Sequence, residues 1–258
     1  MTRQSRAARA TRVTAERAHR LIEAVVTPGG ARALRTWRPF SLAAFRLVTG
    51  LAQDGTVFAT VIDVGANAGQ FARACLGVWP ESTIVAFEPL PGLAEQLTAT
   101  LGAAGRVEAQ AVAIGATDGD TQFFPHPNSL SSSALNVAEP VRAEPWAQEL
   151  PATTVPLRRL DTALAGRHLA RPALLKIDVQ GLELDVLAGA PETLRRMDAV
   201  LVEAAFDPQY EGQPPFSAVH AALTGEGWSL DRPLDVRRDG GGRAVEADWL
   251  YHRASTIT

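Results

Sequence analysis

The sequence is poor in cysteine and in lysine. Among its 258 residues Cys75 is the single cysteine, and Lys176 is the single lysine among 25 basic residues. One cysteine excludes an internal disulfide framework and a cysteine-based metal cluster, so we expect a reducing, cytoplasmic compartment. No run of about 18 apolar residues is present, and the start lacks the apolar core of a signal peptide. The sequence therefore predicts neither secretion nor integration into a membrane.

The chain also lacks a strong net charge. Its formal net charge is −3, which does not favour binding to a phosphate backbone, so no nucleic-acid partner is expected. Nine arginines nevertheless lie in the first 38 residues, against Glu16 and Glu23. We expect residues 1–50 to form a largely solvated helical extension, although such a helix could also touch an anionic membrane or act as a transit peptide. Residues 51–258 would form one α/β domain, and a homo-oligomer is left open.

From residue 57 onward, short β-branched runs alternate with helical stretches. This order is typical of a parallel sheet with crossover helices. Strands are predicted over residues 57–64, 82–89, 106–115, 172–179 and 199–206, with short closing strands over 228–230 and 248–253. Residues 116–160 have no regular pattern and, with the loop at 207–216, are predicted to choose the substrate.

A glycine-containing turn, DVGANAGQ at residues 63–70, stands where the first strand meets a helix. Gly65 and Gly69 permit close approach of a cofactor to the end of the strand. A dinucleotide fingerprint would need a third glycine where Gln70 stands, which disfavours the alternative of an NAD(P)-dependent Rossmann oxidoreductase. Glu88 ends the second strand, where a carboxylate can hold ribose hydroxyls. Together these features favour S-adenosylmethionine over a plain strand-to-helix turn with a solvated glutamate.

Several segments then resemble the FkbM family of S-adenosylmethionine-dependent methyltransferases. They are DVGANAGQ, AFEPLPG, LRRLDTAL, LLKIDVQGLELDVLAGA and AVLVEAAF, and the resemblance covers about residues 60–232. It implies a Rossmann-like class I methyltransferase fold, a seven-stranded, mostly parallel sheet with helices on both faces and an antiparallel last strand. It also implies methyl transfer to a hydroxyl of a small metabolite, sugar or glycoside. The cofactor-binding residues expected from it are Asp63, Gly65, Ala66, Asn67, Gly69, Phe71, Glu88 and Pro89.

The candidate catalytic group is Asp178, which closes the fourth strand and should face the crevice at the carboxyl ends of the sheet. Lys176 lies two residues earlier on the same face, and its ammonium would favour the ionised carboxylate if the two approach within about 4 to 6 Å. Asp178 is thus a candidate general base, with Lys176 and Glu203 as further catalytic candidates. The alternative is that Lys176 and Asp178 form a purely structural ion pair.

Further candidates lie in the turn after this strand and in the irregular segment. His126 is the alternative general base. The expected acceptor-binding residues are Ser131, Ser132, Gln180 and Glu183. A divalent ion held by Asp178, Glu203 and Asp161 is conceivable, but these acids are scattered along the chain, so no metal is predicted. A third hypothesis for the function of the protein is a catalytically inactive scaffold that binds the cofactor.

Overall fold

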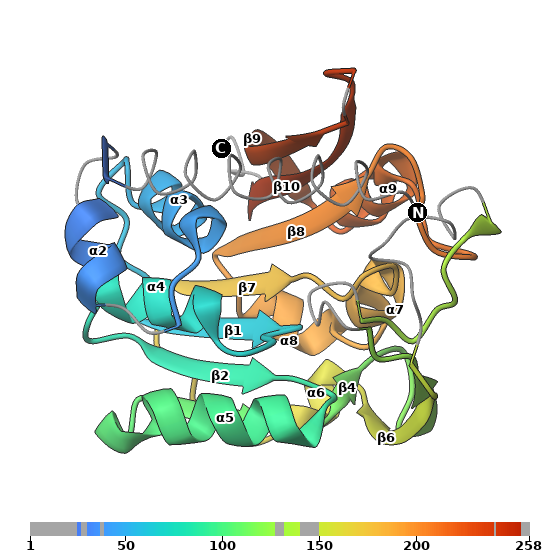
Figure 1. Ribbon diagram of the computed structural model, residues 1–258, viewed down its shortest axis with the longest axis horizontal. Helices are drawn as coiled ribbons and strands as arrows, with labels where there is room; N and C mark the ends of the chain where they lie inside the picture. Colours follow the sequence, from blue (N-terminus) through green and yellow to red (C-terminus); the bar gives the residue numbers. More distant parts are fainter. Residues whose placement is uncertain are drawn as a thin grey trace, which may run out of the picture.

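The computed structural model describes residues 25–26, 30–36, 39–126, 132–139, 150–239 and 241–253. These residues contain the predicted seven-stranded sheet (Figure 1). In spatial order its strands are β3 (Val107–Gln110), β2 (Thr83–Phe87), β1 (Thr60–Val64), β7 (Ala173–Ile177), β8 (Ala199–Ala205), β10 (Ala244–Arg253) and β9 (Trp228–Arg238). Strand β10 runs antiparallel to both neighbours, whereas β3, β2, β1, β7 and β8 pair in parallel. The predicted fold class is confirmed.

Helices cover both faces of this sheet (Figure 1). Helices α3 (Leu42–Leu51), α4 (Gln70–Val78) and α5 (Pro91–Leu101) contribute to one apolar cluster, and α6 (Leu160–Ala163), α7 (Glu183–Ala188), α8 (Pro191–Arg195) and α9 (Phe216–Gly225) to the other. Two shorter elements are α2 (Gly30–Thr36) and the 3-10 turn η1 (Gly102–Ala104). None of the helices in the described residues is long and apolar enough to cross a membrane.

Helix α3 lies within the first 51 residues and is part of the core. The side chain of Ser41 caps it by accepting the amide N–H of Ala44 at 3.3 Å. Its buried residues recur at helical spacing, and they are Ala44, Phe45, Leu47, Val48 and Leu51. This stripe packs in the same apolar cluster as α4 and α5, so α3 is a structural part of the layer beside the sheet.

The alternation of side chains along the strands decides which side of the sheet carries the site. Val61 of β1 belongs to the cluster under α3, α4 and α5, whereas Ile62 and Val64 belong to the opposite cluster. Leu174 of β7 lies on the same side as Val61. Because successive side chains point to opposite faces, Asp63 and Lys176 point toward the α3–α4–α5 layer near the carboxyl ends of their strands.

The predicted third strand, residues 106–115, is divided between two sheets. Its first half is β3, and its second half is β4 (Ala113–Ile114), which joins a separate three-stranded sheet with β6 (Thr153–Arg158) and β5 (Gly119–Phe123). The segment expected to be irregular thus contains two strands. Both have mostly exposed or half-buried residues, so they lack the apolar run by which the other strands are recognised.

Two other predicted boundaries were wrong. The first strand begins at Thr60 and not at residue 57, and the closing strands are long, with 11 residues in β9 and 10 in β10. These two strands form an antiparallel hairpin, in which backbone pairing and not apolar content sets the length. The side chain of Asp239 accepts the N–H groups of Gly241 and Arg243 and so closes the turn between them.

Candidate active site

The glycine turn after β1 approaches the end of β7 very closely. Gly65 has φ of 80°, and a Cβ atom placed on it would lie 1.8 Å from the backbone oxygen of Asp178. Only glycine fits there, because it tolerates this φ and has no side chain to overlap the neighbouring strand. Two more residues of the turn, Asn67 and Gly69, also have positive φ, at 50° and 85°. The turn therefore brings backbone close to the strand ends, as a bound cofactor requires.

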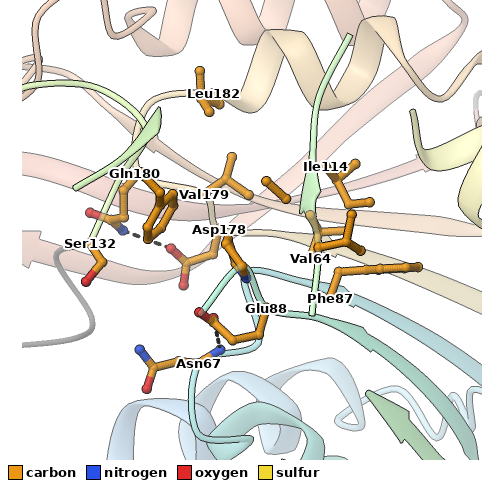
Figure 2. Close-up of a pocket in the computed structure, with 15 residues that line it drawn as sticks. Val64, Asn67, Phe87, Glu88, Ile114, Ser132, Asp178, Val179, Gln180 and Leu182 are labelled. Carbon is orange, nitrogen blue, oxygen red and sulfur yellow. Dashed lines mark hydrogen bonds between the residues drawn. The ribbon is translucent and has the colours of Figure 1, made fainter. Parts of the chain in front are cut away.

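Glu88 is fixed beneath this turn. One oxygen of its carboxylate accepts the N–H of Asn67 at 2.8 Å (Figure 2). The other accepts the N–H of Leu90 at 3.0 Å. Burial raises the pKa of the Glu88 carboxyl, and these two N–H groups act in the opposite direction. A carboxylate has about four acceptor positions, so each oxygen can still accept a hydroxyl from a ligand.

A pocket with about 570 Å³ of empty space, part of it open to solvent, lies over these strand ends. Seven of the residues predicted for the site line it, namely Gly65, Asn67, Glu88, Pro89, Ser132, Asp178 and Gln180. Four predicted cofactor residues, Asp63, Ala66, Gly69 and Phe71, do not. The eight other lining residues are all apolar and were not predicted, and they are Val64, Phe87, Val112, Ala113, Ile114, Phe123, Val179 and Leu182. Apolar residues at strand ends resemble core residues, so no sequence signal singles them out.

Lys176 lies beneath the pocket floor and is 4% exposed. Its Nζ is 3.2 Å from Asp63 and 3.3 Å from Asp178, and it donates to the backbone oxygen of Gly65 at 3.1 Å. The predicted approach of Lys176 to Asp178 is therefore present, and Asp63 is a second partner that the sequence had suggested for the cofactor. The ammonium joins β1, the glycine turn and the end of β7.

The charges of this group are strongly affected by burial. Burial alone would lower the pKa of Lys176, but the carboxylates of Asp178 and Asp63 outweigh it and raise that pKa above its ordinary range. Burial raises the pKa of Asp63, which is 0% exposed, and the nearby ammonium opposes this increase. Lys176 therefore stays protonated, and Asp63 depends on it for its negative charge.

Gln180 connects two carboxylates at the pocket wall. Its Nε2 donates to Asp178 at 2.8 Å and to Glu203 at 2.6 Å, and Figure 2 shows the amide reaching toward Asp178. Gln180 has φ of 55°, an uncommon backbone conformation for a residue with a side chain. Burial and then the charge of Asp178 raise the pKa of Glu203 well above its ordinary value. Glu203 therefore has a stronger tendency to hold a proton than an exposed glutamate has.

Further carboxyl groups lie beside Asp178 and Glu203 on the neighbouring strands of the sheet. Asp248 of β10 pairs in register with Glu203 of β8 and with Asp235 of β9. Burial and the charge of Asp178 raise the pKa of Asp248 to about 8. In the described residues no group of three or more His, Cys, Asp or Glu side chains is arranged to hold a metal ion. Asp161 lies elsewhere, because its carboxylate accepts the backbone N–H groups of Glu192 and Thr193 at the start of α8.

The remaining predicted residues lie around the pocket and not in its lining. Glu183 is 2% exposed and accepts the N–H of Gly181 at 2.9 Å, and burial raises its pKa to about 7. His126 is buried, and its ring nitrogens have no hydrogen-bond partner among the described residues. The backbone N–H of His126 donates to the hydroxyl of Ser132 at 3.1 Å. Ser132 lines the pocket, so His126 lies directly behind a lining residue. Ser131 lies outside the described residues.

Comparison with known proteins gives consistent matches. The family profile described as the Methyltransferase FkbM domain matches residues 63–230, 168 of the 258 residues. The 2-O-methyltransferase NoeI of Sinorhizobium fredii is 31% identical over 166 residues, 62% of this chain and 68% of that protein. The hexuronic acid methyltransferase AglP of Haloferax volcanii is 30% identical over 150 residues, 57% of each chain. The crystal structure of human N-acetylserotonin methyltransferase in complex with SAM aligns with a TM-score of 0.42 at 14% identity, over 83% of this chain and 52% of that one.

Proposed function

The chain belongs to the FkbM family of S-adenosylmethionine-dependent methyltransferases, and from this membership we propose that it methylates a hydroxyl group of a sugar, a glycoside or a similar small metabolite. The observation that carries the proposal is that the glycine turn, Glu88 and Asp178 line the same pocket. A cofactor-binding edge and a candidate base are thus close enough to act on the same pair of ligands.

The residues around the pocket fit S-adenosylmethionine. Gly65 lets the turn pack against the end of β7, where its backbone can approach a ligand, and Glu88 has acceptor capacity for ribose hydroxyls. The apolar residues Val112, Ile114 and Phe123 would hold the adenine ring. When bound, the cofactor supplies an electrophilic methyl group on a positively charged sulfur.

Asp178 is the group best suited to take the proton of the acceptor hydroxyl. One of its oxygens lies near the Lys176 ammonium and the other accepts from Gln180, so the carboxylate is held in place from both sides. It lines the pocket, whereas Glu203 does not, and burial raises the pKa of Glu203 and so favours its protonated form. We therefore assign the general base to Asp178 and a hydrogen-bonding role to Glu203.

The relatives support oxygen as the acceptor atom. One of them is named as a 2-O-methyltransferase, and the other is named for a hexuronic acid. The oxidoreductase interpretation is excluded by family membership, since members of this family transfer methyl groups. The inactive scaffold predicts cofactor binding without turnover, and an experiment can separate it from the proposed function.

The test has two steps. Calorimetry with S-adenosylhomocysteine and, separately, with NADH should give binding for the first compound alone. Transfer of a radiolabelled methyl group to a panel of neutral sugars, uronic acids and glycosides should then label at least one acceptor at a hydroxyl. Binding of S-adenosylhomocysteine with no labelled product from any acceptor would support the scaffold, and binding of NADH alone would contradict the assignment of the cofactor.

We also propose that the enzyme works in the cytoplasm on a small molecule and not on nucleic acid. The net charge of −3 and the single, buried Cys75 support this proposal. Localisation of a fluorescent fusion of the full chain tests the compartment, and a gel-shift titration with RNA and DNA tests the partner. Fluorescence confined to a membrane, or a saturable shift at physiological salt, would contradict it.

A further inference from the structure

Two loops expected to choose the acceptor are joined to each other. Residues 132–139 and 206–213, here called the clasp, pair through backbone hydrogen bonds. Ala138 donates its N–H to Gln209 at 2.8 Å, and Glu211 donates to Asn136 at 2.8 Å. Between these bonds, Val137 and Tyr210 form a bridge, and both side chains are buried. The clasp is therefore a packed unit with a small apolar core.

The clasp rests directly on the turn that follows β7. A Cβ atom on Gly181 would lie 2.7 Å from the side chain of Leu135 and 3.4 Å from that of Gln213, both in the clasp. The hydroxyl of Ser133 donates to the backbone oxygen of Gln180 at 2.6 Å. Because Gly181 has no side chain, the clasp can pack against the backbone beside the candidate base.

Tyr210 extends this contact to the side chain of Gln180. Its hydroxyl donates to the amide oxygen of Gln180 at 3.1 Å, while the amide nitrogen donates to the carboxyl groups of Asp178 and Glu203. The orientation follows from chemistry, because an ionised carboxylate can only accept and needs the NH2 group, which leaves the amide oxygen for the tyrosine. Burial raises the pKa of Tyr210, so its hydroxyl keeps the proton that it donates.

We propose that Tyr210 is a positioning residue for methyl transfer, which acts through the Gln180 amide to hold Asp178 and Glu203 in their working arrangement. This inference rests on the proposed function and adds a residue that lies outside the pocket lining. Without the hydroxyl, the Gln180 amide oxygen loses the side-chain donor that the described residues provide, and the amide nitrogen is held less firmly toward Asp178. The clasp, which supplies Ser132 to the pocket lining, thereby also influences the geometry of the base.

Other ionisable groups near Asp178 and Glu203 also contribute to the pH dependence of this site. Lys176 lies beneath Asp178, and Asp248 faces Glu203 from β10. Glu246, which pairs with Arg237, and Glu183, at the start of α7, also act on Tyr210. A change confined to the Tyr210 hydroxyl leaves all of these groups in place.

The chain offers a matched control, because its other tyrosine is also buried and hydrogen-bonded. The hydroxyl of Tyr251 lies 3.1 Å from Nδ1 of His220, outside the pocket lining. Tyr210→Phe should lower kcat about tenfold, leave KM for S-adenosylmethionine unchanged and move the acid limb of the kcat profile to higher pH. Tyr251→Phe should leave kcat and the profile unchanged. Equal kcat and profile for Tyr210→Phe and wild type, or equal effects of the two variants, would overturn the proposal.

Action through Gln180 is tested by a double-variant cycle. If Tyr210 acts only on that amide, Tyr210→Phe combined with Gln180→Met should be no slower than Gln180→Met alone. Independent, multiplicative losses would show that Tyr210 acts by another route and would overturn the proposal.

A readout without turnover separates this inference from the proposed function. In the complex with S-adenosylhomocysteine, the side-chain 15N–1H2 signals of Gln180, assigned with Gln180→Met, should be distinct and protected from exchange in wild type. They should shift and exchange faster with water in Tyr210→Phe but not in Tyr251→Phe. Unchanged signals in Tyr210→Phe would refute the positioning role even if the protein methylates, and a changed signal would support it even if no acceptor is found.

Discussion

The ammonium of Lys176 and the carboxylate of Asp63 lie 3.2 Å apart, and neither side chain lines the pocket. Asp178 and the backbone oxygen of Gly65 also lie near this ammonium, at 3.3 Å and 3.1 Å. A compact ammonium on a slender stem suits such a site better than the broad fork of an arginine. This explains the single lysine in a chain that otherwise uses arginine.

Replacing Lys176 by methionine should destabilise the protein strongly. The change leaves Asp63 buried without a compensating charge, and breaking a buried pair in this way costs about 3 to 5 kcal/mol. Urea unfolding followed by circular dichroism measures the loss. Asp63→Asn in the same chain should recover part of it, because the uncompensated charge is then removed. A Lys176→Met protein within about 1 kcal/mol of wild type would contradict the structural role given to this pair.

Gly65→Ala should be far more damaging than Gly55→Ala. Both glycines have φ near 80°, but a Cβ on Gly55 meets nothing within 4 Å, whereas one on Gly65 overlaps the backbone of Asp178. Gly55→Ala should lower the free energy of unfolding by about 1 to 2 kcal/mol, because alanine disfavours this φ. Gly65→Ala should cost more than about 4 kcal/mol or prevent folding. Similar unfolding midpoints for the two variants would show that the close approach of the turn to β7 is not needed.

Glu88→Ala should weaken the binding of S-adenosylhomocysteine at least about tenfold, because a charge-assisted hydrogen bond of about 1.5 to 3 kcal/mol is lost. Calorimetry measures the change in Kd. The matched control is Glu81→Ala, since Glu81 is exposed and pairs with Arg106 on the surface. Unchanged affinity in Glu88→Ala would remove the ribose contact from the proposal.

Asp178→Asn should lower turnover by at least about 100-fold, the usual contribution of a general base, while the affinity for S-adenosylhomocysteine stays within a few fold. Glu203→Gln should be milder, because Glu203 does not line the pocket and burial raises its pKa, which favours the protonated form that glutamine imitates. Initial rates of methyl transfer measure both effects. If Asp178→Asn retained wild-type rates, or if Glu203→Gln were the slower variant, the assignment of the base would be wrong.

Glu183→Gln should make stability less dependent on pH. The pKa of Glu183 is about 7 in the folded protein against an ordinary 4.5, so folding favours its protonated form. Its contribution to stability is full below about pH 4.5 and is lost as pH rises through about 7. The variant should match wild type near pH 5 and exceed it by roughly 2 to 3 kcal/mol near pH 8. Urea unfolding at both pH values measures this difference, and parallel curves for the two proteins would contradict it.

Much of the fold follows from sequence because its central strands are buried on both faces. Strands β1, β2, β7 and β8 consist almost entirely of buried residues and read as continuous apolar runs. Strands β5 and β6 do not, because they form a small, half-solvated sheet, and their pairing depends on contacts distant in sequence. The same distinction explains why the long hairpin of β9 and β10 was predicted only in part.

The polar half of the site was easier to predict than the apolar half. Glu88 and Asp178 directly follow strands, where an acid has no role in the core and indicates a ligand. Val112 and Phe123 carry no such signal, and they reach the pocket only because the small sheet folds back over the strand ends. The partnership of Lys176 with Asp63 depends on the register of β1 and β7, which a single sequence does not specify.

The segment that forms the small sheet starts and ends at neighbouring points of the domain. Ile114 of β4 pairs with Arg158 of β6, and the N–H of Gly115 donates to the oxygen of Arg158 at 3.0 Å. A segment whose two ends meet in this way can be lengthened, shortened or exchanged during evolution with little effect on the seven main strands. Because that segment supplies Phe123 and Ser132 to one wall, new substrates can be acquired while Gly65 and Glu88 keep the methyl donor unchanged.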